Sequence, residues 1–513
     1  MSKTAKAAVG LFILTFFSKI LGFVRDIMVA YKYGATRLND IFIMSQDIPV
    51  LLFAIVTSAV ATGFVPIYCK LAEKESREKA HGFTLRLMGY VTAMSVVFTL
   101  LGWYFMPQII RVIAVGYSGE DFKLLVFCTR LLMPNIIFVG AASVLRAYHR
   151  AEGRYQISSI NTVVINLVVM GFVVISPKDS ITLMIIGVMI GLSIDFFMQW
   201  FYARKQGLTL KTAEAPSPES FKEFFYVIMP MILATLVGQV NTIVDKTMAS
   251  TLPAGNITYL NNAFKLTTFT NGIFAVSLGT VLFSLMTNYS VGGKIPEFKR
   301  AFMKSINLII LVTIPLTVIT IFYSREVVEI LFERGAFTAK DTTMTAYVLC
   351  AYAVGMIGVG LREMIVKAYF ALQDTTTPMR NGIFTLVINV ALDIILIKYL
   401  GPVGLALATS FSITATSLYL FWQLRQKIGR FGGRKMMSET WLICLATIIM
   451  TGILFIVGIG VNQLHLHGKM QAMVLIVVGT GLGLITYAAV LEAFKLETWV
   501  TVRNGVLKKM KLG

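Results

Sequence analysis

The sequence predicts an all-α integral membrane protein with about fourteen transmembrane helices. The first observation is composition, because 56% of the 513 residues are hydrophobic, only 14% are charged and the mean hydropathy is +0.76. A soluble domain does not need so apolar a composition. The second is that apolar stretches long enough to cross a bilayer recur throughout the chain, which favours helices over barrel strands. The third is that basic residues gather in alternate connections.

The predicted helices follow one another with short connections. Each is an apolar stretch of roughly 18 residues or more, the length that a membrane helix requires. In chain order they cover residues 8–31, 41–66, 84–106, 122–147, 156–175, 181–203, 223–250, 258–286, 303–323, 343–371, 380–399, 402–424, 440–461 and 470–494.

The net charge of +20 is explained by membrane topology rather than by nucleic-acid binding. Basic residues cluster in alternate loops, whereas the intervening loops are nearly bare, and this bias sets the orientation of membrane proteins. The clusters lie at 70–79, 146–154, 204–211, 294–300, 425–435 and 508–511. We therefore expect both termini on the cytoplasmic side and no nucleic-acid partner. The first apolar run has no small-residue cleavage motif and is expected to remain as an anchor.

Two distant segments indicate an internal repeat. The stretch LRAYHRAEGRYQISSINTVVINLVV at 145–169 and the stretch VKAYFALQDTTTPMRNGIFTLVINVAL at 366–392 share a basic residue, Ala-Tyr, a polar loop and Val-Ile-Asn. A similar offset brings Asp26 onto Asp245. The sequence therefore predicts two six-helix lobes, at 1–210 and 218–430, related as parallel repeats, with the two helices of 438–497 outside them. Transporters with a midplane site use repeats of this kind.

Charged residues inside the predicted helices mark a candidate site, because each costs at least about 2.5 kcal/mol to insert into a membrane. Arg25 and Asp26 share a helix face with Gly22, which leaves room beside them. The other positions are Lys19, Asp40, Asp47 and Lys265. These residues either pair between helices and fix packing, or form a cationic cavity for an anionic group. We favour the cavity, because the arginine fork suits phosphate.

A second group of polar residues offers only hard oxygen donors. Thr385, Asn389 and Asp393 share one helix face, and Asn241 and Asp245 share another at the same spacing. Carboxylate, amide and hydroxyl oxygens suit a small cation, and transporters place coupling-ion sites near the midplane. A proton relay or a polar contact between helices fits the same residues.

Signatures of catalysis and of nucleotide binding are lacking in the sequence. No Ser-His-Asp or Cys-His arrangement stands out, and the segment 292–294, Gly-Gly-Lys, lacks the remainder of a phosphate loop. The four cysteines are scattered and indicate neither disulfides nor a metal site. We therefore expect a transporter rather than an enzyme, with no bound cofactor other than a coupling ion.

Several motifs resemble those of the MurJ family, also called MviN, the lipid II flippases of bacterial cell-wall synthesis. They are SKILGFVRDIMVAYKYGATRLNDIF with GFVP, then LFERGAFTAKDT, AYFALQDTTTPMR and GPVGLALATS. The resemblance covers essentially the whole chain. It implies the fold of the multidrug/oligosaccharidyl-lipid/polysaccharide exporter superfamily, with a groove for the lipid tail at 438–497. It further implies a monomer in the bacterial plasma membrane that moves undecaprenyl-diphosphate-linked disaccharide pentapeptide to the outer leaflet by alternating access.

The resemblance also assigns substrate-binding residues. Arg25, Asp26 and Asp40 match the family's charged positions, whereas Lys19 and Lys265 stand where the family has arginines. Phe53 and Ala54 replace basic residues that usually follow the proline of the second helix. A diphosphate held by Arg25 with Lys19 and Lys265 is the resulting hypothesis, and a related polyprenyl-linked glycan fits the same residues.

A sodium site follows from the oxygen-rich faces together with the resemblance. The expected ligands are Asp245, Asn389, Asp393, Thr409 and the backbone carbonyl of Leu405. A proton shared between two carboxylates is the main rival. Two other function classes stay open. A multidrug-cation antiporter would need an acidic, aromatic pocket, and a glycan-polymerising membrane enzyme would need a catalytic base, for which Glu326, Glu329 and Glu333 lie in an expected solvated loop.

Overall fold

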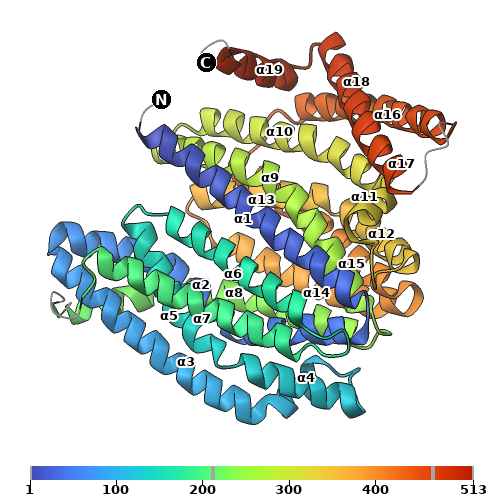
Figure 1. Cartoon of the computed structure of the whole chain (residues 1–513). Helices are drawn as coiled ribbons and strands as arrows, with labels where there is room; N and C mark the ends of the chain where they lie inside the picture. The colour runs from blue at the N-terminus through green and yellow to red at the C-terminus, as the bar shows by residue number, and fades with distance from the viewer. Residues whose placement is uncertain (1–2, 210–213, 216, 464–467, 511–513) are drawn as a thin grey trace. The chain divides into compact units, whose positions relative to one another are not determined.

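The computed structural model describes residues 3–209, 214–215, 217–463 and 468–510, and that part of the chain is helical with no strand (Figure 1). It divides into two compact units, which we describe separately. The first contains Met1–Thr258 and Arg334–Phe337, and the second contains Tyr259–Glu333 and Thr338–Gly513. The fold class predicted from the sequence is therefore confirmed.

The first unit is built from eight helices in the described part of the chain. They are α1 (Lys3–Tyr33), α2 (Arg37–Lys74), α3 (Arg77–Ile113), α4 (Gly119–Leu132), α5 (Asn135–Ala151), α6 (Gln156–Ile175), α7 (Thr182–Lys205) and α8 (Pro218–Ser250). Helix α1 packs against α6, α2 against α5 and α8, and α5 against α3 and α7.

The remaining helices begin with α9 (Asn256–Val291), whose first residues belong to the first unit. The others are α10 (Ile295–Phe322), α11 (Ser324–Phe332), α12 (Ala339–Val354), α13 (Met356–Ala371), α14 (Thr376–Leu400), α15 (Pro402–Ile428), α16 (Gly433–Gln463), α17 (Lys469–Val474), the π-helix η1 (Leu475–Gly479), α18 (Thr480–Ala493) and α19 (Glu497–Met510). Helix α15 packs against α12, α13 and α14, and α16 packs against α10 and α18.

The helices agree with the predicted membrane spans. Ten spans among the described residues are long and apolar enough to cross a membrane, and the pair α4–α5, bent by 41°, adds an eleventh. The other three predicted segments coincide with α1, α8 and α9. The predicted number of about fourteen stays a prediction.

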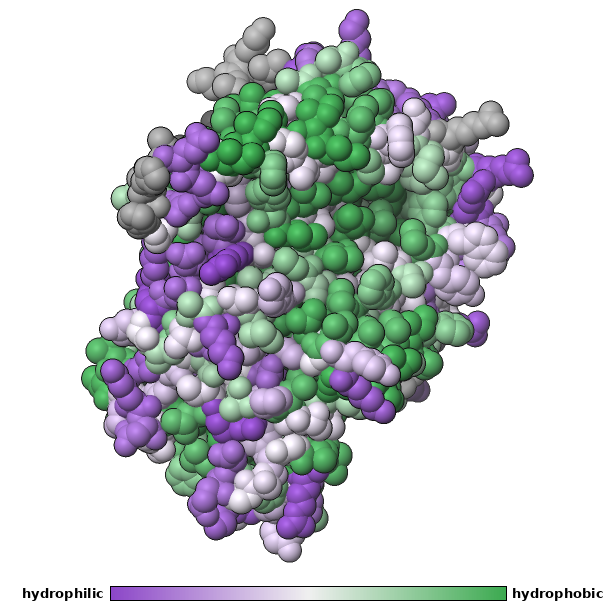
Figure 2. Space-filling view, turned by 90° about the vertical axis from the view of Figure 1, so that its right-hand side faces the viewer, coloured by the Kyte–Doolittle hydropathy of each residue, from purple (hydrophilic) through white to green (hydrophobic). Residues whose placement is uncertain are grey.

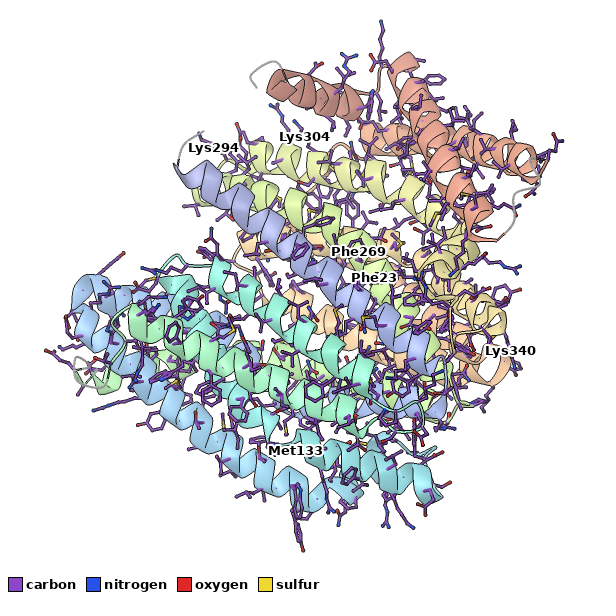
Figure 3. All side chains as sticks on the ribbon, viewed as in Figure 1. Phe23, Met133, Phe269, Lys294, Lys304 and Lys340 are labelled. Atoms are coloured by element: carbon purple, nitrogen blue, oxygen red, sulfur yellow. The ribbon has the colours of Figure 1, made fainter. Side chains whose placement is uncertain are left out.

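Two details of the predicted elements were wrong. The single helix expected at 122–147 is broken between α4 and α5, where Met133 (Figure 3) precedes Pro134, because proline removes a backbone donor and clashes with the preceding turn. The loop expected around Glu326 and Glu329 forms the nine-residue helix α11. It was missed because it is too short and too charged to give a membrane signal.

The predicted lobe boundaries stay a prediction. The first compact unit extends past the lobe boundary predicted at 210–218, because α8 packs against α2 and α3. Corresponding helices nevertheless pack alike in the two units: α5 contacts α3 and α7 as α13 contacts α10 and α15, and α6 contacts α7 as α14 contacts α15.

Large hydrophobic side chains lie exposed on many helices. Trp103, Tyr104, Trp441 and Phe455 are each at least half exposed. Figure 2 shows hydrophobic residues gathered over one face of the molecule. A protein in water rarely exposes apolar patches of this kind, whereas hydrocarbon chains of lipids would cover them.

Candidate functional site

Arg25 and Asp26 form an ion pair on α1. The Nε and Nη2 atoms of Arg25 donate to Oδ1 of Asp26 at 3.2 and 2.9 Å, and Nη1 donates to Oδ1 of Asn166 on α6 at 3.2 Å. Gly22 faces the same side chain, because a Cβ there would lie in ordinary van der Waals contact, 3.5 Å from the Asn166 amide nitrogen. The predicted face therefore exists, and the room beside Gly22 is occupied by Asn166.

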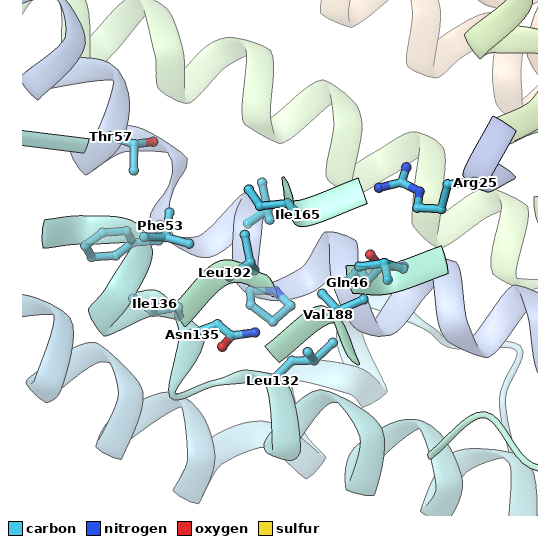
Figure 4. Close-up of a pocket in the computed structure, with 14 residues that line it drawn as sticks. Arg25, Gln46, Phe53, Thr57, Leu132, Asn135, Ile136, Ile165, Val188 and Leu192 are labelled. Carbon is cyan, nitrogen blue, oxygen red and sulfur yellow. The ribbon is translucent and has the colours of Figure 1, made fainter. Parts of the chain in front are cut away.

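The Arg25 side chain also borders a cavity of about 240 Å³ (Figure 4). Its other lining residues are uncharged, mostly apolar, and come from α2 and from α4 to α7: Gln46, Pro49, Val50, Phe53, Thr57, Leu132, Asn135, Ile136, Val139, Ile165, Val169, Val188 and Leu192. The Arg25 side chain is 27% exposed, so it is partly desolvated but reachable. An anion entering this cavity would meet a single cation in apolar surroundings, where electrostatic attraction is strong.

Asp40 occupies a different position from the one expected of a substrate ligand. Its side chain is fully buried and does not line the Arg25 cavity. Oδ2 accepts a hydrogen bond from the Gly255 backbone at 2.6 Å, and Oδ1 accepts from the backbone and hydroxyl of Thr258 at 2.9 and 2.7 Å. Asp40 thus caps the first turn of α9, where a negative charge is stabilised by the helix dipole.

The turn that Asp40 caps belongs to a tight backbone junction in the first unit. A Cβ on Gly255 would lie 2.5 Å from the carbonyl oxygen of Ala35, and one on Gly34 would lie 2.3 Å from that of Ala336. The Ala336 amide donates to the Tyr31 carbonyl at 2.8 Å. The end of α1, the start of α9 and the segment Arg334–Phe337 therefore meet through backbone contacts that exclude side chains.

The other charged residues that the sequence analysis identified, Asp47, Lys19 and Lys265, lie in different environments. Asp47 pairs with Lys246 of α8 at 2.5 Å, a partner that the sequence did not reveal. Lys19 is exposed on α1 and does not line the Arg25 cavity. Lys265 is half-buried on α9 in the second unit. Substrate binding by these residues stays a prediction.

The proposed sodium ligands fall into two groups. In the second unit, Asn389 and Asp393 of α14 are buried, with Nδ2 of Asn389 donating to Oδ2 of Asp393 at 3.2 Å. On the adjacent helix α15, the Thr409 hydroxyl donates to the Leu405 carbonyl at 3.1 Å. Asp245 belongs to the first unit and accepts from Asn241 at 3.2 Å. The donor chemistry of carboxylate, amide, hydroxyl and carbonyl oxygens fits a sodium ion.

Arg362 of α13 is a membrane charge that the sequence analysis missed. Its Nη1 donates to Asn381 at 2.9 Å, to Thr385 at 3.1 Å and to Thr416 at 3.3 Å. Thr385 therefore accepts from this guanidinium, and its expected grouping with Asn389 as a cation ligand stays a prediction. An arginine in the middle of the apolar run 343–371 was the available signal.

A second missed pair joins α5 to α7. Nη1 of Arg146 donates to Oδ2 of Asp195 at 2.6 Å. The Asp195 carboxylate also accepts from Asn161 at 3.0 Å and from Gln199 at 3.2 Å. Arg146 was counted among loop residues, and the signal overlooked was the carboxylate inside the predicted helix 181–203.

Comparisons with known proteins agree on one family. A family model described as "Lipid II flippase MurJ" matches residues 29–479. A probable lipid II flippase MurJ from Thermotoga maritima is 30% identical over 417 residues, covering 80% of this chain and 83% of the relative. Another from Buchnera aphidicola subsp. Acyrthosiphon pisum is 28% identical over 460 residues, covering 88% of this chain and 90% of the relative.

Solved structures give the same result. A structure titled "Lipid II flippase MurJ, inward closed conformation" matches with a TM-score of 0.80 and 25% identity, covering 95% of this chain and 99% of that one. An inward-facing multidrug resistance MATE family transporter of the MOP superfamily matches with a TM-score of 0.69 and 13% identity, covering 80% and 94%. The second likeness concerns the fold alone.

Proposed function

The chain belongs to the MurJ family of lipid II flippases, and from that premise we propose that Arg25 is the residue that grips the diphosphate of lipid II as it crosses the membrane. The protein is accordingly a multi-pass transporter of the bacterial inner membrane whose substrate is a lipid-linked glycan. Its orientation with both termini in the cytoplasm and its monomeric state are parts of the proposal.

The observation that carries the proposal is the Arg25 guanidinium at the edge of an apolar cavity. Asp26 and Asn166 hold its orientation before any ligand arrives. A diphosphate presents more charge than the single Asp26 carboxylate, and a guanidinium binds two phosphate oxygens in one plane. Binding then requires only that the diphosphate oxygens replace Asp26 and Asn166 as acceptors of the Arg25 hydrogen bonds. Lys19 and Lys265 supply additional positive charges at other stages of transport.

Asp40 contributes by positioning rather than by binding. Because both of its oxygens are occupied by the first turn of α9, contact with substrate would require breaking three hydrogen bonds. We assign it to the junction at which α1, α9 and the segment Arg334–Phe337 meet through backbone contacts.

The Arg25 proposal is tested by depletion of the native protein and complementation with variants. We expect Arg25→Ala to abolish export of lipid II while the protein still reaches the membrane, and Arg25→Lys to restore export in part, because an ammonium cannot bind two oxygens in plane. Arg154→Ala, at an exposed position, is the matched control. Normal export by a well-expressed Arg25→Ala variant would overturn the assignment, and accumulation of a different lipid-linked glycan in depleted cells would reassign the substrate.

We also propose that a sodium ion drives the cycle by binding Asp393, Asn389, Thr409 and the Leu405 carbonyl of the second unit, whereas a role for Asp245 of the first unit stays a prediction. Two observations support this proposal. The residues offer oxygen ligands that suit a small cation, and the sequence motifs resemble those of the MurJ family. Ion coupling is energetically adequate, because one charge crossing the membrane field gains about 2.3 kcal/mol per 100 mV.

Exchange of sodium for potassium or choline at fixed pH tests the ion. Transport by the native protein should fall when sodium is withdrawn, and Asp393→Ala should transport slowly in all three cations. Indifference to sodium combined with a steep dependence on pH would instead favour a proton shared by the carboxylates.

A further inference from the structure

A second cavity, of about 420 Å³, lies in the first unit between α2, α5 and α8. Arg146 and Arg150 of α5 are among the residues that line it. The remaining lining residues are small or neutral polar: Ala54, Thr57, Ser58, Ala61, Ser143, Thr235 and Gln239. It is therefore a polar, basic cavity, in contrast to the apolar one beside Arg25.

The cavity carries one positive charge in excess among its described lining residues. Arg146 is neutralised by Asp195, whose oxygens also accept from Asn161 and Gln199. Arg150 lies one turn further along α5, and within the described ranges it forms no ion pair and its buried Nε has no hydrogen-bond partner. An anion in the cavity would supply the counter-charge for Arg150.

The neutral residues suit hydroxyl groups rather than a second anion. The hydroxyls of Thr57 and Ser143 donate to carbonyls of their own helices, which leaves their oxygens as acceptors. Ser58 and Thr235 hydrogen bond to each other at 3.0 Å across α2 and α8. The arginines are donors only, so this lining combines donors for an oxyanion with acceptors for the hydroxyls of a sugar. A glycosyl phosphate satisfies both, whereas inorganic phosphate uses only the first.

We propose that Arg146 and Arg150 form a second headgroup subsite, which binds the phosphate and the adjoining sugar of the lipid-linked glycan; this inference rests on the proposed function. Thr57 lines both this cavity and the one beside Arg25. The subsite therefore adjoins the Arg25 cavity at Thr57, and its two arginines lie near the C-terminal end of α5. The headgroup is captured here first and is then transferred to Arg25 without losing contact with a cation.

Binding of lipid II to the full chain in phosphatidylcholine nanodiscs tests the subsite. Arg150→Gln should weaken binding about 10-fold or more, as expected for loss of a charge-assisted hydrogen bond in a partly buried site. Arg154→Gln removes the same charge at an exposed position four residues later and should change affinity less than about 2-fold. Equal binding by Arg150→Gln and the native protein would overturn the subsite and leave the role of Arg25 intact, whereas no binding of lipid II by the native protein would overturn both.

Two further experiments test whether a variant loses affinity without losing its fold and whether the bound phosphate belongs to lipid II or to another source. The double variant Arg146→Gln, Asp195→Asn removes the partly buried pair without leaving a lone charge, and it should also lose affinity while unfolding like the native protein. Inorganic diphosphate should compete weakly with lipid II, because it offers no sugar hydroxyls. If phosphatidylglycerol in the nanodisc competes as strongly as lipid II and depends equally on Arg150, the cavity is a general phospholipid site and the proposal is wrong.

Discussion

Replacement of Asp40 by alanine should destabilise the protein strongly, although Asp40 lies away from the Arg25 cavity. The carboxylate accepts from two backbone amides, those of Gly255 and Thr258, and all three residues are buried. Truncation leaves both amides without an acceptor, and each such group costs about 1–3 kcal/mol. The Thr258 hydroxyl can rotate to another acceptor and adds little. We therefore expect a loss of about 3 kcal/mol or more.

The assay is the free energy of unfolding in mixed micelles with increasing dodecyl sulfate. Asp40→Asn keeps one acceptor oxygen and should lose less than Asp40→Ala. Asp121→Ala is the matched control, because Asp121 makes only a half-exposed ion pair with Arg37 at 3.4 Å, worth at most about 1 kcal/mol. If Asp40→Ala were no less stable than Asp121→Ala, the capping role would be wrong, and direct binding of substrate by Asp40 would regain support.

One further prediction concerns the junction of α1 and α9, and another concerns the connection between α13 and α14. Gly34→Ala should lower stability by about 2 kcal/mol or more in the same assay, because Gly34 has a φ of +59° and a Cβ would meet Ala336 at 2.3 Å. Asp374, between α13 and α14, has a pKa that burial raises but that hydrogen bonds from Lys427 and Thr377 lower overall. Its contribution to the free energy of unfolding is therefore full above the pKa of the unfolded state and is lost as the pH falls through the lower pKa of the folded state. We therefore expect the free energy of unfolding of Asp374→Asn to decline less steeply with falling pH than that of the native protein.

Membrane spans were predictable from the sequence, but their breaks were not. Apolarity alone determines that a segment enters the bilayer, so the ranges followed directly from composition along the chain. A break depends on how a proline is accommodated. Pro49, Pro66, Pro107 and Pro315 lie inside continuous helices, whereas Pro134 separates α4 from α5. Because all five occur in apolar surroundings, the sequence gives no signal that distinguishes them.

Candidate site residues were predictable as residue types, but their partners were not. Arg25, Asp26 and Asp40 could be identified because charged residues are costly to insert into a membrane, and this argument needs no knowledge of packing. Asn166 and Gly255 became their partners only through helix contacts spanning more than a hundred residues of chain. The distinction between a substrate ligand and a structural cap therefore required the structure, because a buried carboxylate satisfies either role with the same atoms.

Equivalent helices of the two units use arginine in different ways, which limits what the repeat can predict. In the first unit, Arg146 of α5 reaches the carboxylate of Asp195 on α7. In the second, Arg362 of α13 donates to neutral oxygens, one of them that of Thr416 on α15. The shared packing preserves a polar contact between these helices, but its charge balance differs. Because a carboxylate fixes Arg146 in place, the neighbouring Arg150 supplies the excess charge in the first unit, and this asymmetry places the proposed headgroup subsite there.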